Sequence, residues 1–353
     1  MIAAGRLPIP KRTSHFALLV LHFTFAALLA GRACADPPLP PKLDSSVARG
    51  LEFLAAAQGV DGSFGANQKT AITSLALMSF LAAGHTPDVG RYGANVRNAI
   101  DYLLSQTHPD GAFARNEKPM YQQGIGTLAL AEAYGVETDG PQRKRIAAFL
   151  AKSVTYIVEA QKVKKQDVYA GGWRYEPNAP DSDMSLSGWN ALALRACEDA
   201  GIPVPREAAQ RAVQFVLKCY NAQAKGFAYQ PGGAASPGMT GVGVLCLHVL
   251  DTGVAHREAT AAAASLEKHP IDDKSQFPYY AMYYATQAAN QSGDAAWGAV
   301  SKATFEQLLK SQQPDGGWPD TPAESTGAGR AYSTSMAVLT LTIPYRLLPA
   351  YQR

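Results

Sequence analysis

The fold is decided by a short stretch near the C-terminus, which reads Gln312-Gln-Pro-Asp315-Gly316-Gly-Trp318. Two close copies occur earlier, as Gln58-Gly-Val-Asp61-Gly62-Ser-Phe64 and Gln106-Thr-His-Pro-Asp110-Gly111-Ala-Phe113. Two less regular copies lie between them, as Gln161 with Gly171-Gly172-Trp173, and Gln223-Ala-Lys-Gly226-Phe227. Self-similarity at a regular period is the sequence signature of a repeat architecture. The chain therefore consists largely of one structural unit used several times.

The spacing of these copies predicts six units. Their aromatic residues occupy positions 64, 113, 173, 227 and 318, which are 49, 60, 54 and 91 residues apart. The last interval accommodates two repeats. An apolar run with a helical period precedes each copy and another follows it, while Asp-Gly between them is typical of a tight turn. Each unit is therefore predicted to be a helical hairpin, with almost no strand in the chain.

The apolar runs also predict how the helices pack. The first helices are expected at 46–57, 93–105, 142–160, 206–219, 257–268 and 295–311, and the second at 70–84, 121–135, 184–200, 239–252, 278–291 and 331–345. The second helices are apolar nearly all round, whereas the first keep a polar face. A helix without a polar face is buried on all sides. We therefore predict an all-α fold, an α/α toroid with the second helices as an inner ring, rather than an open superhelix.

The repeated turns resemble the QW repeats of squalene and oxidosqualene cyclases and the related repeats of protein prenyltransferase β subunits, over about residues 45–348. Two further stretches resemble short exported bacterial proteins that carry these repeats. They are Tyr279-Tyr280-Ala-Met-Tyr283-Tyr284-Ala-Thr286-Gln287 and Gly329-Arg330-Ala-Tyr332-Ser333-Thr334-Ser335. In such a turn, a Gln side chain can satisfy free backbone groups of a neighbouring helix while the aromatic ring packs over the turn. Gln58, Gln106, Gln312 and the turn aromatics are therefore expected to be scaffold.

Two aspartates precede the third inner helix, in the stretch Pro180-Asp181-Ser182-Asp183-Met184-Ser185. Cyclases that protonate a double bond have an Asp-x-Asp-Asp-Thr motif at this place, and the resemblance would make Asp183 the general acid with Asp181 beside it. Met184 departs from that motif, which weakens the catalytic interpretation. An Asp at a helix N-terminus also caps the helix and is stabilised by its positive end. We favour capping or binding, with general-acid catalysis as the alternative.

A cavity inside the ring is the expected binding site. Its ligand contacts are predicted to come from Trp173, Tyr175, Trp189, Tyr280, Tyr283, Arg330 and Tyr332. Arg330 is expected to pair with Asp181 or Asp183, or else to bind an anionic head group. The chain is long enough for one toroid only, whereas complete triterpene cyclases have two domains. The predicted partner is therefore an isoprenoid-like or other apolar small molecule, or a protein, and the alternative is a cyclase-like enzyme.

No metal or cofactor is expected. A protein prenyltransferase needs a zinc site that activates a thiolate. None of Cys197, Cys219 and Cys246 has an Asp two residues earlier, as that site requires. P-loop, HExxH, thioester and Ser/His/Asp motifs are absent from the sequence. The three thiols are expected to be free and buried, although a bridge between Cys219 and Cys246 is the alternative in an oxidising compartment.

The N-terminus has the pattern of a signal peptide, over residues 1–35. Basic residues precede an apolar run at about 16–30, and Ala33-Cys34-Ala35 is a cleavage site. The run is shorter than the roughly 20 residues that span a bilayer. We therefore expect cleavage after Ala35, export to the periplasm or the medium, a Pro-rich linker at 36–45 and one domain at 46–353. Residues 1–35 hold four of the 32 basic residues and no acidic one, so the remainder is nearly neutral and nucleic-acid binding is not expected.

Overall fold

A computed structural model describes residues 40–113, 118–137, 140–251, 256–269, 277–321 and 329–351, together with residues 254, 271, 275 and 324. The predicted signal peptide lies outside the described residues, as does the first part of the predicted linker. The described residues belong to one compact unit, Pro38–Arg353.

Six helical hairpins make up this unit. The first helices of the hairpins are α1 (Leu43–Ala57), α3 (Gly93–Ser105), α5 (Pro141–Lys162), α7 (Arg206–Lys218), α9 (Arg257–Lys268) and α11 (Asp294–Ser311). The second helices are α2 (Lys69–Ala82), α4 (Pro119–Val136), α6 (Met184–Asp199), α8 (Pro237–Leu250), α10 (Pro278–Ser292) and α12 (Gly329–Leu341). These bounds agree with the predicted ranges to within a few residues.

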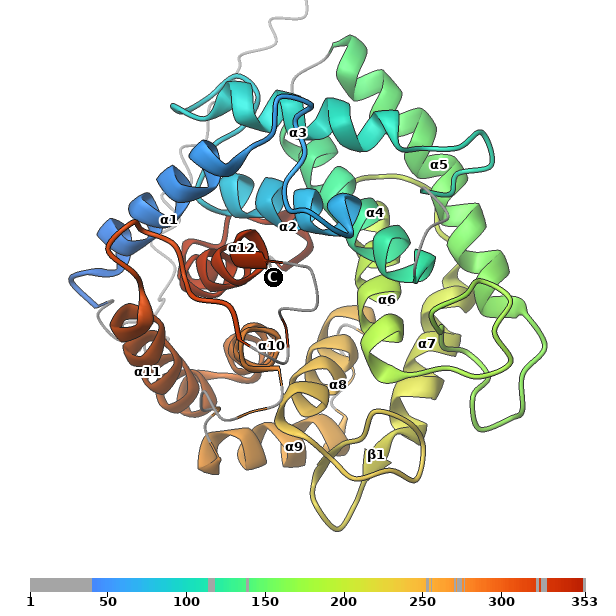
Figure 1. The fold of residues 1–353 in the computed structure, drawn as a ribbon. Helices are drawn as coiled ribbons and strands as arrows, with labels where there is room; N and C mark the ends of the chain where they lie inside the picture. Colours follow the sequence, from blue (N-terminus) through green and yellow to red (C-terminus); the bar gives the residue numbers. More distant parts are fainter. Residues whose placement is uncertain are drawn as a thin grey trace, which may run out of the picture. The chain divides into compact units, whose positions relative to one another are not determined.

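The second helices form a closed inner ring (Figure 1). Each packs against the next one, and α12 packs against α2 to close the circle. Burial follows this arrangement, because nearly every residue of α2 is buried, whereas α7 buries only one face, through Ala208, Ala212, Val213, Phe215 and Val216. The predicted α/α toroid is therefore confirmed. The physical reason is the one read from the sequence, namely that a helix apolar on all sides needs neighbours on all sides.

Glutamine amides tie several of the hairpins to the next one. Gln161 donates from Nε2 to the carbonyl of Gly171 in its own turn at 2.8 Å, and to the carbonyl of Ala208 in the first turn of α7 at 2.9 Å. Gln312 does the same with Gly316 at 2.8 Å and with Ser46 of α1 at 2.9 Å. The second pair of bonds joins the last hairpin to the first.

Gln58 makes the same two bonds, to the carbonyls of Gly62 and Asn95, both at 3.0 Å. Gln106 does not, since its amide donates only to the Ser105 hydroxyl. Its expected scaffold role is taken by Gln123 of α4, whose Nε2 donates to the carbonyl of Gly111 at 2.9 Å and to the hydroxyl of Ser153 on α5 at 2.6 Å. The prediction for Gln106 was therefore wrong, because a residue on the inner helix supplies the amide.

Glycine is required in these turns because each turn lies against the next outer helix. Gly62, Gly111, Gly171 and Gly316 all have φ between 84° and 99°, a region that other residues rarely adopt. A Cβ atom at Gly171 would also lie 2.2 Å from the carbonyl oxygen of Arg211, and one at Gly316 would lie 2.4 Å from that of Arg49. The turn therefore lies directly on the next outer helix, where no side chain fits.

The turn tryptophans fasten the turn to both helices of their own hairpin. The indole N–H of Trp173 donates to the carbonyl of Ile157 in α5 at 2.8 Å, and its backbone N–H donates to the hydroxyl of Ser187 in α6 at 3.0 Å. Trp318 makes the corresponding bonds to Leu308 and Thr334. Both rings are almost fully buried. Trp173, predicted both as scaffold and as a ligand contact, has its polar atom bonded within the scaffold.

The C-terminal segment covers the far ends of the inner helices. It contains two short 3-10 helices, η1 (Ile343–Tyr345) and η2 (Pro349–Tyr351), where the sequence predicted a continuation of the last inner helix. Glu132 of α4 accepts from the backbone N–H of Ala350 at 3.1 Å, and Tyr283 of α10 donates to the Tyr351 hydroxyl at 3.0 Å. Burial raises the pKa of Glu132 to about 8, so this carboxyl is held largely protonated at neutral pH.

Two further details complete the fold. A short antiparallel pair, β1 (Tyr220–Asn221) and β2 (Gly226–Phe227), forms in the least regular turn, where no strand was predicted. Cys197, Cys219 and Cys246 are free and buried. Burial raises the pKa of all three thiols to about 12, so they are inert small core residues.

The glutamine bridges predict an unequal effect of two similar substitutions. Gln161→Ala leaves two buried carbonyls without their donor, and also removes the acceptor that Arg211 Nε reaches at 3.0 Å. We expect it to lower the free energy of unfolding by about 2–4 kcal/mol, at roughly 1 kcal/mol or more per lost bond. Gln106→Ala is the matched control and should change it by less than about 0.5 kcal/mol. Equal effects in urea denaturation would show that the bridges do not stabilise the ring.

Candidate functional site at the N-termini of the inner helices

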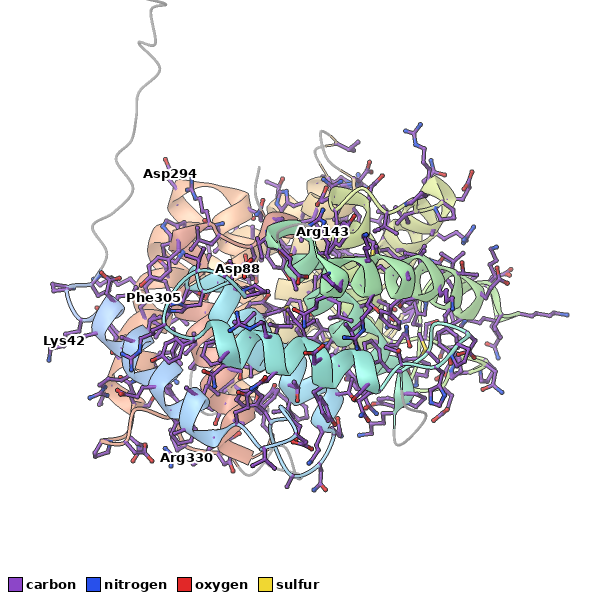
Figure 2. All side chains as sticks on the ribbon, turned by 90° about the horizontal axis from the view of Figure 1, so that it is seen from above. Lys42, Asp88, Arg143, Asp294, Phe305 and Arg330 are labelled. Carbon is purple, nitrogen blue, oxygen red and sulfur yellow. The ribbon has the colours of Figure 1, made fainter. Side chains whose placement is uncertain are left out.

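The inner helices run parallel, so their N-termini meet at one face of the ring. Gly238 near the start of α8 lies beside Ala281 near the start of α10, and Gly241 lies beside Ala285 one turn further along. Figure 2 shows Arg330, in the first turn of α12, at one face of the unit, and Arg143 and Asp294, in the first turns of two outer helices, toward the opposite face. Six positive helix ends therefore share one face, which we call the mouth.

At three of the inner helices, residues from the following repeat lie over the helix start. The backbone N–H of Met120 in α4 donates to the carbonyl of Tyr175 at 3.1 Å, and that of Met184 in α6 donates to Tyr229 at 2.8 Å. At α10 the acceptor is a side chain, because Glu324 accepts from the N–H of Tyr280 at 3.0 Å. These bonds satisfy free helix donors. They also bring Tyr175, Tyr229 and Glu324 to the mouth.

Asp183 lies at the N-cap position of α6. Its Oδ1 accepts from the N–H of Leu186 at 2.9 Å and from the hydroxyl of Ser185 at 2.7 Å. Its Oδ2 accepts from Nη1 of Arg174 at 2.7 Å, and the side chain is fully buried. Both carboxylate oxygens are therefore occupied by donors from the protein. Such a carboxyl is well placed to order the helix start.

Arg174 is the centre of the polar network at the mouth. Besides Asp183, it contacts Asp181 through Nε at 3.2 Å and the hydroxyl of Tyr229 through Nη1 at 2.7 Å. The Tyr229 hydroxyl lies 2.7 Å from that of Tyr175, whose ring lies 4.5 Å from the guanidinium carbon. Arg174 thus neutralises both aspartates and fixes two tyrosines.

Three other tyrosines complete the mouth, from three inner helices. Tyr121 of α4 lies with its hydroxyl 2.7 Å from that of Ser185, and Tyr332 of α12 donates to Glu324 at 3.5 Å. Burial raises the pKa of the Tyr280 and Tyr332 hydroxyls well above the ordinary value for tyrosine. Both residues nevertheless keep part of their surface exposed. They are therefore largely enclosed by protein but not fully covered.

An aromatic cluster lies beneath these tyrosines. Trp189 of α6 is buried and stacks on Tyr283 of α10, with ring centres 6.3 Å apart and planes at 12°. Its ring also meets Tyr280 and Tyr284 edge-on, at 6.5 and 5.2 Å. Trp189 follows Asp183 by six residues, which is roughly 9 Å along the helix. Trp189 and Tyr283 therefore form the floor below the mouth, and Tyr280 connects floor and mouth.

The expected pairing of Arg330 with Asp181 or Asp183 is wrong. Its guanidinium binds Asp315 through two bonds of 2.7 Å, and lies 4.7 Å from the Phe53 ring of α1. Asp315 belongs to the turn of the same repeat, which folds back beside the first turn of α12. The aspartates pair instead with Arg174, which is closer to them both in the sequence and in the ring.

Sequence reasoning missed Tyr121, Tyr229 and Glu324. A signal existed for Tyr229, because it follows the turn aromatic Phe227 by two residues, as Tyr175 follows Trp173. Glu324 follows Trp318 by six residues and belongs to no copy of the repeat, so nothing in the pattern marks it.

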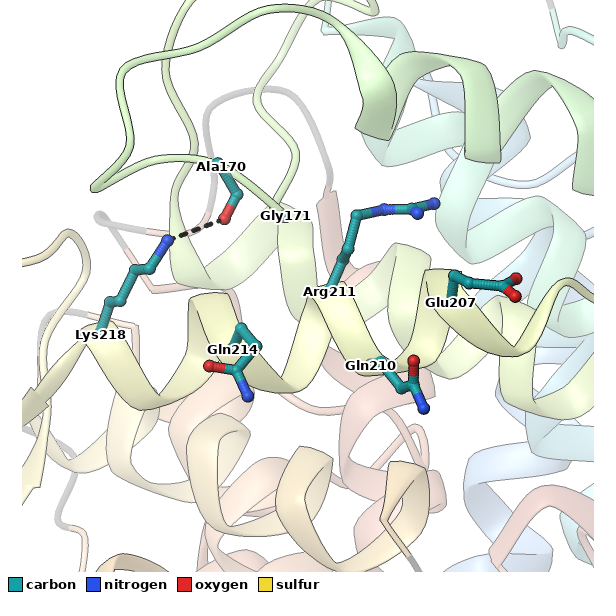
Figure 3. Close-up of a pocket in the computed structure, with 7 residues that line it drawn as sticks. All are labelled: Ala170, Gly171, Glu207, Gln210, Arg211, Gln214 and Lys218. Atoms are coloured by element: carbon teal, nitrogen blue, oxygen red, sulfur yellow. Dashed lines mark hydrogen bonds between the residues drawn. The ribbon is translucent and has the colours of Figure 1, made fainter.

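A separate groove lies outside the ring, along α7. It has a volume of about 540 Å³ and is lined by Ala170, Gly171, Glu207, Gln210, Arg211, Gln214 and Lys218 (Figure 3). Lys218 donates to the carbonyl of Ala170 at 3.4 Å, and Arg211 Nε donates to the amide oxygen of Gln161. These side chains hold the turn of the third repeat, which accounts for their position without a ligand.

The described residues contain no group of three or more His, Cys, Asp and Glu side chains arranged to hold a metal ion. Within the same part of the chain, no helix has both the length and the apolar character needed to cross a membrane.

No protein-family model matches the chain, and no characterised sequence matches it significantly. Solved structures do share its fold. The type II terpene cyclase MstE from Scytonema is 16% identical with a TM-score of 0.54, over 87% of this chain and 99% of that chain. Candida albicans protein geranylgeranyltransferase-I is 13% identical with a TM-score of 0.54, over 87% and 95%. A glycosidase is 13% identical with a TM-score of 0.53, over 87% and 98%.

The chain is thus similar in fold to terpene cyclases and to prenyltransferase-fold proteins. Because a glycosidase has the same fold at a similar score, the fold alone does not select a reaction.

Asp183 and Asp181 give a matched pair for a stability test. Asp183→Asn keeps a capping oxygen but removes the charge that faces Arg174, whose side chain is 22% exposed. We expect the free energy of unfolding to fall by about 2–3 kcal/mol, which is less than the cost of removing one partner from a fully buried ion pair. Asp181→Asn, at a 32% exposed side chain, should cost less than about 1 kcal/mol. Losses of equal size in chemical denaturation would contradict the assigned geometry.

Proposed function

We propose that this protein binds an apolar, isoprenoid-like ligand at the mouth of the ring, without converting it. The observation that carries the proposal is the arrangement of Tyr121, Tyr280 and Tyr332, which remain partly accessible above the buried ring of Trp189. Aromatic faces offer large apolar contact areas at low entropic cost, and binding sites are commonly apolar recesses with a few polar groups.

The structural neighbours give independent support for the ligand class. MstE has been solved with geranylgeranyl dihydroxybenzoate as substrate and with merosterolic acid A as product. The Candida albicans transferase has been solved with GGPP. Both are isoprenoid-binding proteins on this fold, so a ring of this size is able to hold such a chain.

Binding without turnover is the better proposal because of the state of Asp183. A general acid must present a proton to the substrate at hydrogen-bond distance. Asp183 is fully buried, and its oxygens accept from Arg174, Ser185 and Leu186. The residue in the acid's position therefore serves the helix start and the arginine. Cyclisation by Asp183 is the alternative function, favoured only by the position of this residue at the mouth.

Export is a separate part of the proposal and rests on residues 1–35. Their basic start, apolar run and Ala-Cys-Ala end support secretion into the periplasm or the medium. Outside the cytoplasm, a small binding protein would protect a poorly soluble ligand from water.

The binding proposal is tested with geranylgeraniol and squalene as probes. We expect saturable quenching of tryptophan fluorescence by at least one of them, because Trp189 lies beneath the mouth. Tyr332→Ala should weaken that binding at least tenfold, whereas Tyr345→Ala, on the C-terminal segment, should leave it unchanged. Gas chromatography of the same mixtures should return unchanged probe. Binding by neither probe would reject the proposal, and a cyclised product that disappears in Asp183→Asn would establish the enzymatic alternative.

A further inference from the structure

The charges at the mouth restrict the head group of the ligand, if the proposed binding function is correct. Three carboxylates lie there, on Asp181, Asp183 and Glu324. Glu324 is nine-tenths buried and accepts from the first N–H groups of α10. Arg174 balances part of this charge, and burial raises the pKa of Glu324, but an anionic group that entered the mouth would still meet three carboxyl groups and one bound arginine.

Three of the described basic side chains at this face already have anionic partners. Arg174 binds Asp181 and Asp183, Arg330 binds Asp315 through two bonds, and Lys69 pairs with Asp61 at 3.3 Å. Lys118 lies with Nζ 5.3 Å from the centre of the Tyr175 ring. A diphosphate is normally bound by arginine or lysine side chains that have no other anionic partner. This mouth presents no such pair of cations among the described residues.

One polar atom at the mouth does call for a partner. The hydroxyl of Tyr280 is buried and has no hydrogen bond within the described residues, although its side chain keeps some accessible surface. The ring is held in place by Trp189 at 6.5 Å and by Tyr284 at 4.7 Å. A buried hydroxyl without a partner is unfavourable, and a ligand oxygen would remove that penalty.

The neighbours of Tyr280 indicate where that oxygen would lie. The hydroxyl of Tyr280 interacts electrostatically with Tyr121 of α4, Asp183 at the N-cap of α6, Tyr332 of α12 and Cys246 of α8. It therefore lies inside the ring, among groups from four other inner helices. By contrast, the hydroxyl of Tyr284 also lacks a partner but is fully buried, one turn deeper on the same helix.

We propose that the ligand is an uncharged isoprenoid that carries a hydroxyl or carbonyl group, and that Tyr280 hydrogen-bonds to this group at the mouth. The apolar chain then lies against the aromatic surface around it. On this proposal, prenyl diphosphates are not ligands of the mouth.

The test compares three probes of related structure, which are geranylgeraniol, geranylgeranyl diphosphate and the hydrocarbon squalene. We expect the alcohol to bind at least tenfold more tightly than the diphosphate in isothermal titration calorimetry. Tyr280→Phe should weaken binding of the alcohol about tenfold and leave that of the hydrocarbon unchanged. Tyr284→Phe is the matched control on the same helix and should change neither affinity.

Four results would overturn the inference. The first is binding of the diphosphate as tight as that of the alcohol, and the second is an equal effect of Tyr280→Phe on alcohol and hydrocarbon. The third is absence of binding by all three probes, which would also remove the proposed function. Tight binding of squalene with no preference for the alcohol would keep the proposed function and reject the role of Tyr280. Thermal melting of each variant should first show a midpoint close to that of the wild type.

Discussion

The bridge from a glutamine amide to two carbonyls, one in its own turn and one in the next outer helix, is the contact on which the ring depends. Gln58, Gln161 and Gln312 all make it, and Gln312 joins the last hairpin to the first. The turn glycine beside it has a left-handed conformation and no room for a Cβ atom. These hairpins therefore set the position of their neighbours, and the bridge from Gln312 joins the ends of the ring.

Ring closure produces the candidate site as a consequence. The inner helices run parallel, so their N-termini share one face, and each needs acceptors for its first N–H groups. The following turn supplies them, and with them come Tyr175, Tyr229 and Glu324. Asp183 caps the start of α6, and its second carboxylate oxygen pairs with Arg174. Tyr121, Tyr280 and Tyr332 remain partly accessible there, and they give the mouth aromatic surface.

The sequence predicted the repeat count, the ring and most helix bounds, because these depend on local turn chemistry and on apolar periodicity. It also placed the start of α6 after Pro180. It failed where a contact depends on side chains that no repeat marks. Gln123 of the inner helix replaces Gln106, and Arg330 binds Asp315 rather than the aspartates before α6. Glu324 reaches α10 from a turn 44 residues later in the chain, and spacing alone does not reveal such a contact.

The mouth is proposed to retain an uncharged isoprenoid. This can be tested by organic extraction of the protein after purification from cells that make isoprenoids, followed by mass spectrometry of the extract without preselection of masses. We expect a neutral isoprenoid with a hydroxyl or carbonyl group, at close to one molecule per chain, and much less of it from Tyr332→Ala. An anionic lipid at that stoichiometry, or an extract that is the same for both proteins, would show that the mouth does not select such a ligand.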